Sequence, residues 1–219
     1  MENSQRAFEF LKAGNAGALR QLMEDDAAAA ETRDPTGVSL LMQSLYHGHR
    51  DLADLIAGKK HSLDIFEAAA LGRLDRLRAC INDASTINSY SNDGFTALHF
   101  ACFFGQPEAA RLLLEAGATA DGVAANPTKV MPLHSAASAR NLEAARLLLE
   151  RGAPANARQQ GGWAPIHAAA QNGDRALVEL LLKRHADPKL ANDAGKTPAM
   201  VAREKGHNEI ADLLEKQKS

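Results

Sequence analysis

Histidine is the residue type in this chain with the widest choice of chemistry, because an imidazole can bind a metal or transfer a proton. The chain has eight histidines, and His99, His134 and His167 follow one another at intervals of 35 and 33 residues. These intervals predict one histidine in each of three stacked repeats, about 10 Å from the next, which is the distance between packed helix layers. Zinc ligands lie about 2.1 Å from one metal ion. The three histidines therefore cannot share a metal, and we expect each of them to have a structural role.

A second histidine group is more compact. His47 and His49 flank Gly48, and His61 completes the group within 15 residues. Three imidazoles this close could meet around a metal, so a metal-binding sensor or an enzyme is the alternative hypothesis for this chain. No carboxylate or cysteine stands near them at a metal-ligand spacing, and we favour three separate surface side chains. No metal or other cofactor is expected.

Other reactive motifs are missing from the sequence. It has no Gly-rich phosphate loop and no nucleophile elbow. Cys80 and Cys102 are 22 residues apart, which is neither a disulfide framework nor a zinc spacing. We expect two buried, reduced thiols, as in a cytosolic protein. Lys59 and Lys60 are expected to form a solvated pair in a loop. The chain is therefore predicted not to be an enzyme.

The composition is that of an ordinary soluble, folded chain. Of its 219 residues, 45% are apolar and 24% are charged. Its 25 basic and 27 acidic residues leave no basic excess of the kind that nucleic-acid binding requires. No run approaches the roughly 18 apolar residues of a membrane span, and the N-terminal segment does not resemble a secretory signal. We expect a cytoplasmic protein that binds neither nucleic acid nor membrane.

The elements that carry these residues form an internal repeat. Segments 93–118, 130–153 and 161–186 nearly superimpose, and 194–216 is a fourth copy. In each copy a short Ala-rich helix is followed by a turn residue, usually Gly, and by a second helix with apolar residues at helical spacing. Neither helix could bury its apolar face alone, so we expect about seven stacked helix pairs, the first and last of them caps. The turn markers are Gly14, Gly48, Gly72, Gly105, Arg140, Gly173 and Gly206.

These copies resemble the ankyrin repeat, whose pattern runs roughly Gly-x-Thr-Pro-Leu-His-x-Ala-Ala, then Gly, a Leu-rich helix and Gly-Ala-Asp. The resemblance is strong over 91–216 and weaker over 5–90. It implies an all-α, ankyrin-repeat α-solenoid with short β-hairpin loops, which is an adaptable binding scaffold. The matching segments are Thr96-Ala97-Leu98-His99, Met131-Pro132-Leu133-His134, Ala164-Pro165-Ile166-His167 and Thr197-Pro198-Ala199-Met200.

We expect the whole chain, residues 1–219, to form a single ankyrin-repeat domain. Within it, 1–33 is the expected N-terminal capping unit and 34–90 holds degenerate repeats. The well-formed repeats fill 91–188, and 189–219 is the expected C-terminal capping repeat.

Two departures from the period predict local irregularity. Only 24 residues separate Gly48 from Gly72, and the deficit falls in the connection 58–64. We expect a tight turn there instead of a full hairpin, weak coupling between the units that it joins, and unfolding of the N-terminal units first. Arg140 stands where other units have Gly, and a non-glycine residue with positive φ is strained, so this turn is expected to be irregular. Its unit also has two extra residues in the loop 122–129.

The resemblance places a partner-binding surface on the concave face, which is built from hairpin tips and the exposed sides of the first helices. The positions that point there carry five of the chain's ten aromatic residues. Clustered exposed apolar residues mark interaction surfaces, and Trp and Tyr are enriched in binding hot spots. The predicted partner-binding residues are Tyr46, His47, Phe95, Phe103, Phe104, Trp163, Gln171 and Asn172.

Packing between repeats is the competing interpretation for one of Phe103 and Phe104, and Phe100 is expected to point inward. The sequence thus predicts a non-catalytic protein–protein interaction module, a monomer, that binds an unidentified partner protein through its concave face. It does not separate a scaffold from an inhibitory or chaperone-like subunit.

Overall fold

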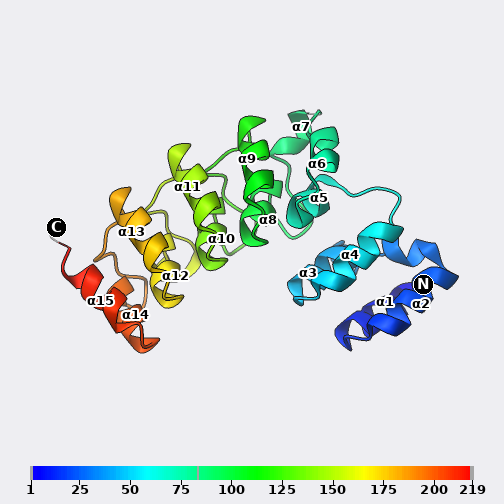
Figure 1. Cartoon of the computed structure of the whole chain (residues 1–219), viewed down its shortest axis with the longest axis horizontal. Coiled ribbons are helices and arrows are strands. Elements are labelled where there is room, and N and C mark those ends of the chain that lie inside the picture. Colours follow the sequence, from blue (N-terminus) through cyan, green and yellow to red (C-terminus); the bar gives the residue numbers. More distant parts are fainter. Residues whose placement is uncertain (1, 83, 218–219) are drawn as a thin grey trace.

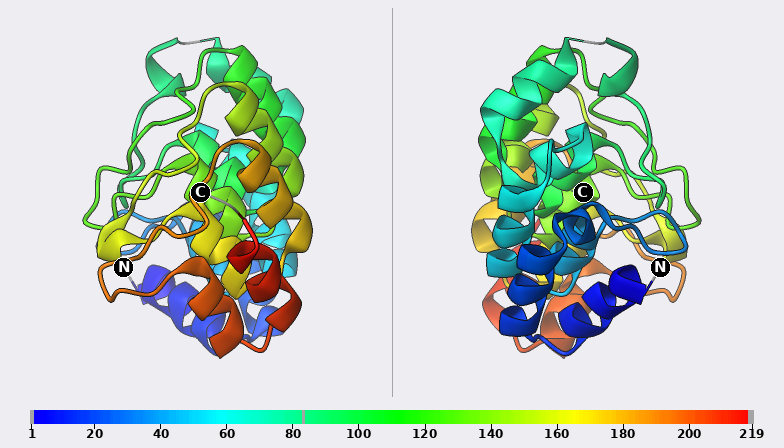
Figure 2. Two further views of the ribbon diagram at one scale, coloured as in Figure 1. Left: turned by 90° about the vertical axis from the view of Figure 1, so that its left-hand side faces the viewer. Right: turned by 90° about the vertical axis from the view of Figure 1, so that its right-hand side faces the viewer.

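The architecture is a stack of helix pairs. The computed structural model describes residues 2–82 and 84–217, and within them seven helix pairs follow one another along the chain. From α5 (Ile65–Leu71) to α15 (Asn208–Glu215), successive pairs lie side by side in an arc. The first helix of each of these pairs lies on the inner side of the arc (Figure 1). Connecting loops gather on one side of the stack (Figure 2). The predicted all-α fold is confirmed. The pairs are α1 (Glu2–Lys12) with α2 (Ala16–Asp25), α3 (Leu40–Tyr46) with α4 (Arg50–Lys59), α5 (Ile65–Leu71) with α6 (Leu74–Ile81), α8 (Ala97–Phe103) with α9 (Pro107–Glu115), α10 (Pro132–Ser138) with α11 (Leu142–Glu150), α12 (Pro165–Gln171) with α13 (Arg175–Lys183), and α14 (Pro198–Glu204) with α15 (Asn208–Glu215). The connections also hold α7 (Ala84–Ile87) and two 3-10 turns, η1 (Ala27–Glu31) and η2 (Gln160–Gly162).

The turn between the two helices of a pair has the same backbone form in every unit. All seven markers adopt the left-handed conformation, with φ between 57° and 80°. Glycine does so without steric cost, whereas another residue loses about 1–2 kcal/mol. At Arg140 the turn is nevertheless regular, because the N–H of Asn141 donates to the carbonyl of Ala136 at 2.9 Å, as Gln106 does to Ala101 at 2.8 Å in the preceding unit. The expected irregularity was wrong, since the hydrogen bonds and helix packing impose the conformation on Arg140.

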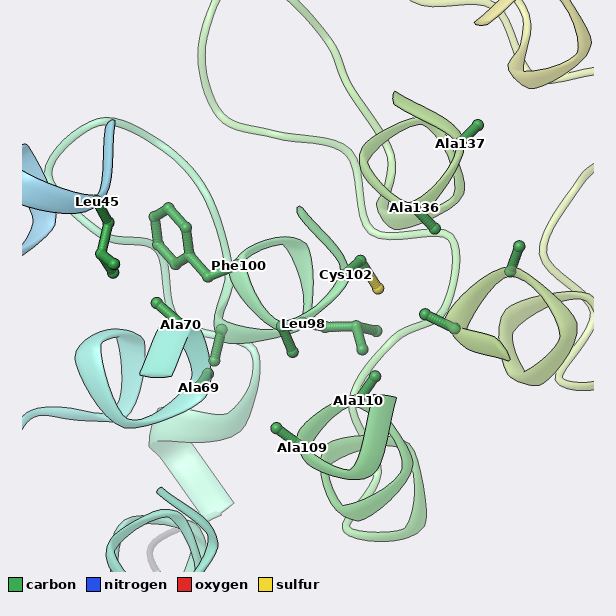
Figure 3. Close-up of a cluster of buried hydrophobic side chains, with 14 of the residues drawn as sticks. Leu45, Ala69, Ala70, Leu98, Phe100, Cys102, Ala109, Ala110, Ala136 and Ala137 are labelled. Atoms are coloured by element: carbon green, nitrogen blue, oxygen red, sulfur yellow. The ribbon is translucent and has the colours of Figure 1, made fainter. Parts of the chain in front are cut away.

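Small side chains let neighbouring first helices approach closely. Ala101 and Cys102 of α8 and Ala136 of α10 are fully buried, and Figure 3 shows Cys102 directed toward Ala136. Burial raises the pKa of the Cys102 thiol. Cys80 is only half-buried, so the prediction of two buried thiols holds for one of them. The reason is that α6 lies in the outer row and fully buries a single leucine, Leu77.

Backbone hydrogen bonds close the loops that lead into the first helices. The N–H groups of Ser91, Gln159 and Asn192 each donate to the carbonyl four residues later, at 2.9, 2.9 and 3.0 Å. In the unit with two extra residues, Ala124 donates to Val130 at 2.8 Å instead. The described part of the chain forms no β-strand and one isolated β-bridge. The expected hairpin loops are therefore hydrogen-bonded turns.

The connection between α4 and α5 is extended. Lys60 and Asp64, at its two ends, have φ and ψ of −73° and 148° and of −76° and 176°. No hairpin forms there, as predicted, but the expected tight turn was wrong. Residues 60–64 have to span the distance from one helix pair to the next, and an extended residue spans only about 3.3–3.6 Å. A tight turn would shorten this connection, so the chain stays extended.

Lys60 is buried at the start of this connection. Its side chain is 3% exposed, and its ammonium lies 2.8 Å from Oε2 of Glu31 and 3.3 Å from Oε1 of Glu67. The Glu67 side chain is 1% exposed, and burial together with the nearby Asp64 raises the pKa of its carboxyl group. The expectation of a solvated lysine pair was wrong for Lys60, because two carboxylates draw it inward, whereas Lys59 is exposed.

Beyond this junction, the N-terminal helices contact the α8 unit directly. The ring centroids of Tyr46 and Phe104 are 6.0 Å apart, and the Tyr46 hydroxyl donates to Asp93. In the loops above, a Cβ atom at Gly37 would collide with the side chain of Asn92. Both contacts bypass α5, because the unit built on α5 lacks a hairpin.

Candidate partner-binding surface

The three repeated histidines are structural, as predicted. His99, His134 and His167 are at most 3% exposed. Each Nδ1 accepts the N–H of the backbone three residues earlier, at 3.1 to 3.3 Å, and each Nε2 therefore donates to a carbonyl in the following loop. Burial lowers the pKa of all three, that of His99 to about 4, so the rings are neutral at pH 7. The acceptors of the Nε2 bonds are Val130, Ala157 and Lys196, at 3.1, 3.0 and 3.2 Å.

The compact histidine group does not assemble. The ring centroids of His47 and His49 are 6.5 Å apart at one end of α4, and His61 lies beyond the other end. A ten-residue helix is about 15 Å long, so His61 cannot share a ligand with the pair. Within residues 2–82 and 84–217, no three His, Cys, Asp or Glu side chains form a group that could hold a metal. The alternative hypothesis of a metal site at these histidines was therefore wrong.

An aromatic cluster lies where α3 meets α8. Phe104 lies at its centre, with ring centroids 5.2 Å from Phe103, 6.0 Å from Tyr46 and 6.4 Å from Phe100. Phe103 is 48% exposed and Tyr46 is 39% exposed, whereas Phe100 is 3% exposed and points inward as predicted. Phe104 and Phe95 are partly buried against the core. Of the two candidates for packing between repeats, Phe104 packs and Phe103 faces solvent.

A groove of about 250 Å³ runs beside this cluster, between α8 and α10. Its apolar wall includes Tyr46, Phe95 and Phe103. It extends from the loop end, at Val130, to the turn end, at Ser138. The groove therefore combines residues of the α8, α10 and α12 units with Tyr46 of α3.

Tyr46 is fixed in the groove wall by its phenol group. Its hydroxyl donates to Asp93, which also accepts a hydrogen bond from the Ser91 hydroxyl at 2.5 Å. Burial and the Asp93 carboxylate raise the pKa of the Tyr46 phenol, so it stays a neutral donor at pH 7. This bond holds one wall of the groove in place before any ligand binds.

Trp163 lies in a second, shallower hollow of about 420 Å³ that shares Ser138 with the groove. Its ring meets His167 edge-on at 5.5 Å between centroids. Gln171 is exposed in this hollow, while Asn172 donates to the carbonyls of Ala137 and Ser138, at 3.2 Å each. The two hollows are adjacent, so the predicted residues around Phe103 and Trp163 belong to one continuous surface.

Some predicted and observed residues differ. His47 is exposed but lines neither hollow. Ser138 and Gln159 line both hollows but were not among the predicted residues, although Ser138 stands only two residues before the turn marker Arg140. Phe66 was also missed, and its ring meets Phe100 at 6.0 Å. Nothing in the degenerate repeat around Phe66 indicates that contact.

Comparison with known proteins agrees with this geometry. The family model described as ankyrin repeats (3 copies) matches residues 65–159 and 133–219, which is most of the chain. The chain belongs to the ankyrin-repeat family. It is 41% identical over 56 residues to the ankyrin repeat domain-containing protein oryK of Aspergillus oryzae, a match that covers 26% of this chain and 9% of that protein. The chain thus spans less than a tenth of the length of this curated relative. Ankyrin repeats are generally protein-interaction modules without catalytic activity.

No helix in the described residues combines the length and the apolar character needed to cross a membrane.

Proposed function

We propose that this chain is a non-catalytic interaction module that binds a partner protein through the inner face of its solenoid, as a cytoplasmic monomer. The observation that carries the proposal is the exposed Phe103 beside a preformed apolar groove. Exposed aromatic residues next to a pocket are typical of binding hot spots. Because the groove wall is already held by the Tyr46–Asp93 hydrogen bond, binding would order few side chains.

An affinity capture from a lysate of the source organism tests this proposal. The baits are the parent chain, the Phe103→Ala variant and a Tyr90→Ala control. Tyr90 is also 48% exposed, but it lies in a loop outside the aromatic cluster and both hollows. Circular dichroism first establishes that each bait is folded.

The parent and the Tyr90→Ala control should retain the same partner. Phe103→Ala should weaken its binding by about 2 kcal/mol or more, which is roughly thirtyfold. A partner that all three baits retain equally would place the interface elsewhere on the solenoid.

A further inference from the structure

Within the described ranges, neither the groove beside Phe103 nor the hollow at Trp163 has a charged residue in its wall, although 24% of the chain is charged. The walls consist of aromatic, aliphatic, amide and hydroxyl side chains and two buried, neutral histidines. Asp93 and Lys129 adjoin lining residues but line neither hollow themselves. Because burying an unpaired charge costs several kcal/mol, these walls favour an uncharged segment of a partner.

Both hollows present polar side chains that make no hydrogen bond to any other described residue. The indole N–H of Trp163 is one such group, and it can only donate. The others are hydroxyl and amide groups, which can donate to the carbonyl oxygens of a bound main chain. They belong to Ser135, Ser138, Gln159, Gln160 and Gln171.

These unpaired groups limit the conformation of the bound main chain. The described residues form no β-strand, so they offer no sheet edge to which an extended peptide could add. A helix uses its own carbonyl groups internally, and one turn of it fills roughly 400 Å³, which exceeds the groove volume of about 250 Å³. A polyproline II segment has no internal hydrogen bonds, so all of its carbonyl groups remain available to donors on the protein.

Exposed aromatic rings in both hollows can pack against proline rings. Phe103 is 48% exposed and Tyr46 is 39% exposed in the groove, and Trp163 is partly exposed in the second hollow. Proline has no N–H group, so each proline adds an apolar contact without leaving a donor unpaired. Aromatic-lined grooves are the typical binding sites of proline-rich segments.

The separation of the two hollows sets the length of the segment. Phe103 belongs to α8 and Trp163 directly precedes the α12 unit, with α10 between them. Two helix layers at about 10 Å each amount to about 20 Å. At about 3.1 Å per residue, a polyproline II segment needs about six or seven residues to reach from one ring to the other.

We propose that the groove and the second hollow together bind an uncharged, proline-rich segment of the partner in the polyproline II conformation, with one proline packed against Phe103 and another against Trp163. This inference rests on the proposed function and names the chemistry of the partner. Ser138 and Gln159 line both hollows, so they donate to carbonyl groups between the two aromatic contacts.

Selection of a phage-displayed random peptide library on the full chain tests this proposal. Enriched peptides are synthesised with a fluorescent label, and their affinities are measured by fluorescence anisotropy. The variants compared with the parent are Phe103→Ser, Trp163→Ala and Gln159→Leu, which removes the amide without changing the charge. Tyr90→Ala is the control, because Tyr90 is equally exposed but lines neither hollow. Circular dichroism first establishes that each variant is folded.

The expected peptides are neutral and rich in proline. Phe103→Ser and Trp163→Ala should each weaken their binding about thirtyfold, Gln159→Leu about fivefold, and Tyr90→Ala less than about twofold. Replacing the prolines of a peptide by alanine should weaken it at least about fivefold, because the segment is no longer preorganised. The affinity should change less than about twofold between 0.05 and 0.5 M sodium chloride, because no charged wall residue is available to be screened.

Charged or proline-free peptides that depend on Phe103 would overturn the proline-rich partner and leave the proposed function intact. Proline-rich peptides that bind Trp163→Ala as tightly as the parent would overturn the joint use of the two hollows. No enrichment, or peptides indifferent to Phe103→Ser, would overturn peptide binding at this surface. The affinity capture with Phe103→Ala then decides the proposed function separately.

Discussion

Replacing Lys60 by Met tests the buried ion pair that joins the N-terminal units to the rest of the solenoid. Met keeps most of the aliphatic contact and removes the charge. Glu31 is 38% exposed and can be solvated, so the cost falls on Glu67, which is 1% exposed. Removing one member of a buried pair costs about 3–5 kcal/mol if the other member must stay charged.

Protonation of Glu67 sets an upper limit on that cost. From an ordinary pKa of 4.5, protonating the carboxyl group at pH 7 costs about 3.4 kcal/mol, at 1.36 kcal/mol per pH unit. Burial already raises the pKa of Glu67, and the loss of Lys60 raises it further. A raised carboxyl pKa means that the folded state binds more protons, so stability falls as pH rises above 4.5. We therefore expect Lys60→Met to cost about 2–3 kcal/mol at pH 7 and about 0.7 kcal/mol or less at pH 5.

Urea unfolding followed by far-UV circular dichroism at both pH values measures this difference. Lys59→Met is the matched control, because Lys59 is the neighbouring exposed lysine and should cost no more than about 0.5 kcal/mol. Equal costs for the two variants at pH 7 would refute the buried pair. A Lys60→Met deficit of the same size at pH 5 would refute the role assigned to Glu67.

Three further predictions use the same chain. The N-terminal helices should unfold first, so the circular dichroism transition in urea should begin before the fluorescence change of Trp163, the chain's only tryptophan; coincident transitions would contradict weak coupling at the junction. Arg140→Gly should stabilise the fold by about 0.5–1 kcal/mol, because it relieves a φ of 57°, whereas Arg140→Ala should give no gain; equal effects would show that the turn is unstrained. Burial lowers the pKa of His99 to about 4, so the unfolded state binds more protons and stability should fall by up to about 3 kcal/mol as pH drops from 6.5 toward 4. In His99→Gln this slope should be shallower, and an unchanged slope in urea titrations would refute the assignment.

Local rules in the sequence were sufficient to predict the repeated part of the fold. Each turn marker could be identified because the left-handed conformation favours glycine, and each repeated histidine because it recurs with the period of the stack. The turn marker Gly105 also predicted that Phe103 is exposed, because the position of the turn fixes which side of the first helix faces solvent. Arg140 also adopts the left-handed conformation that its place in the repeat predicts, although a non-glycine residue disfavours positive φ.

Features that depend on contacts between distant segments could not be predicted in this way. Lys60 is buried because Glu31 and Glu67, distant in sequence, converge on it. Tyr46 reaches Phe104 only because the unit between them lacks a hairpin. The sequence showed that residues were missing there, but the three-dimensional path across the gap is set by the packing of both neighbours.

Site-specific photo-cross-linking is the sharpest test of whether a partner protein binds at Phe103. A photoreactive benzoylphenylalanine replaces Phe103 in one preparation and the equally exposed Tyr90 in another, and each is irradiated in lysate. We expect a cross-linked protein adduct at Phe103 and none at Tyr90. An adduct at Tyr90 alone, or the same adducts in equal yield at both positions, would contradict it.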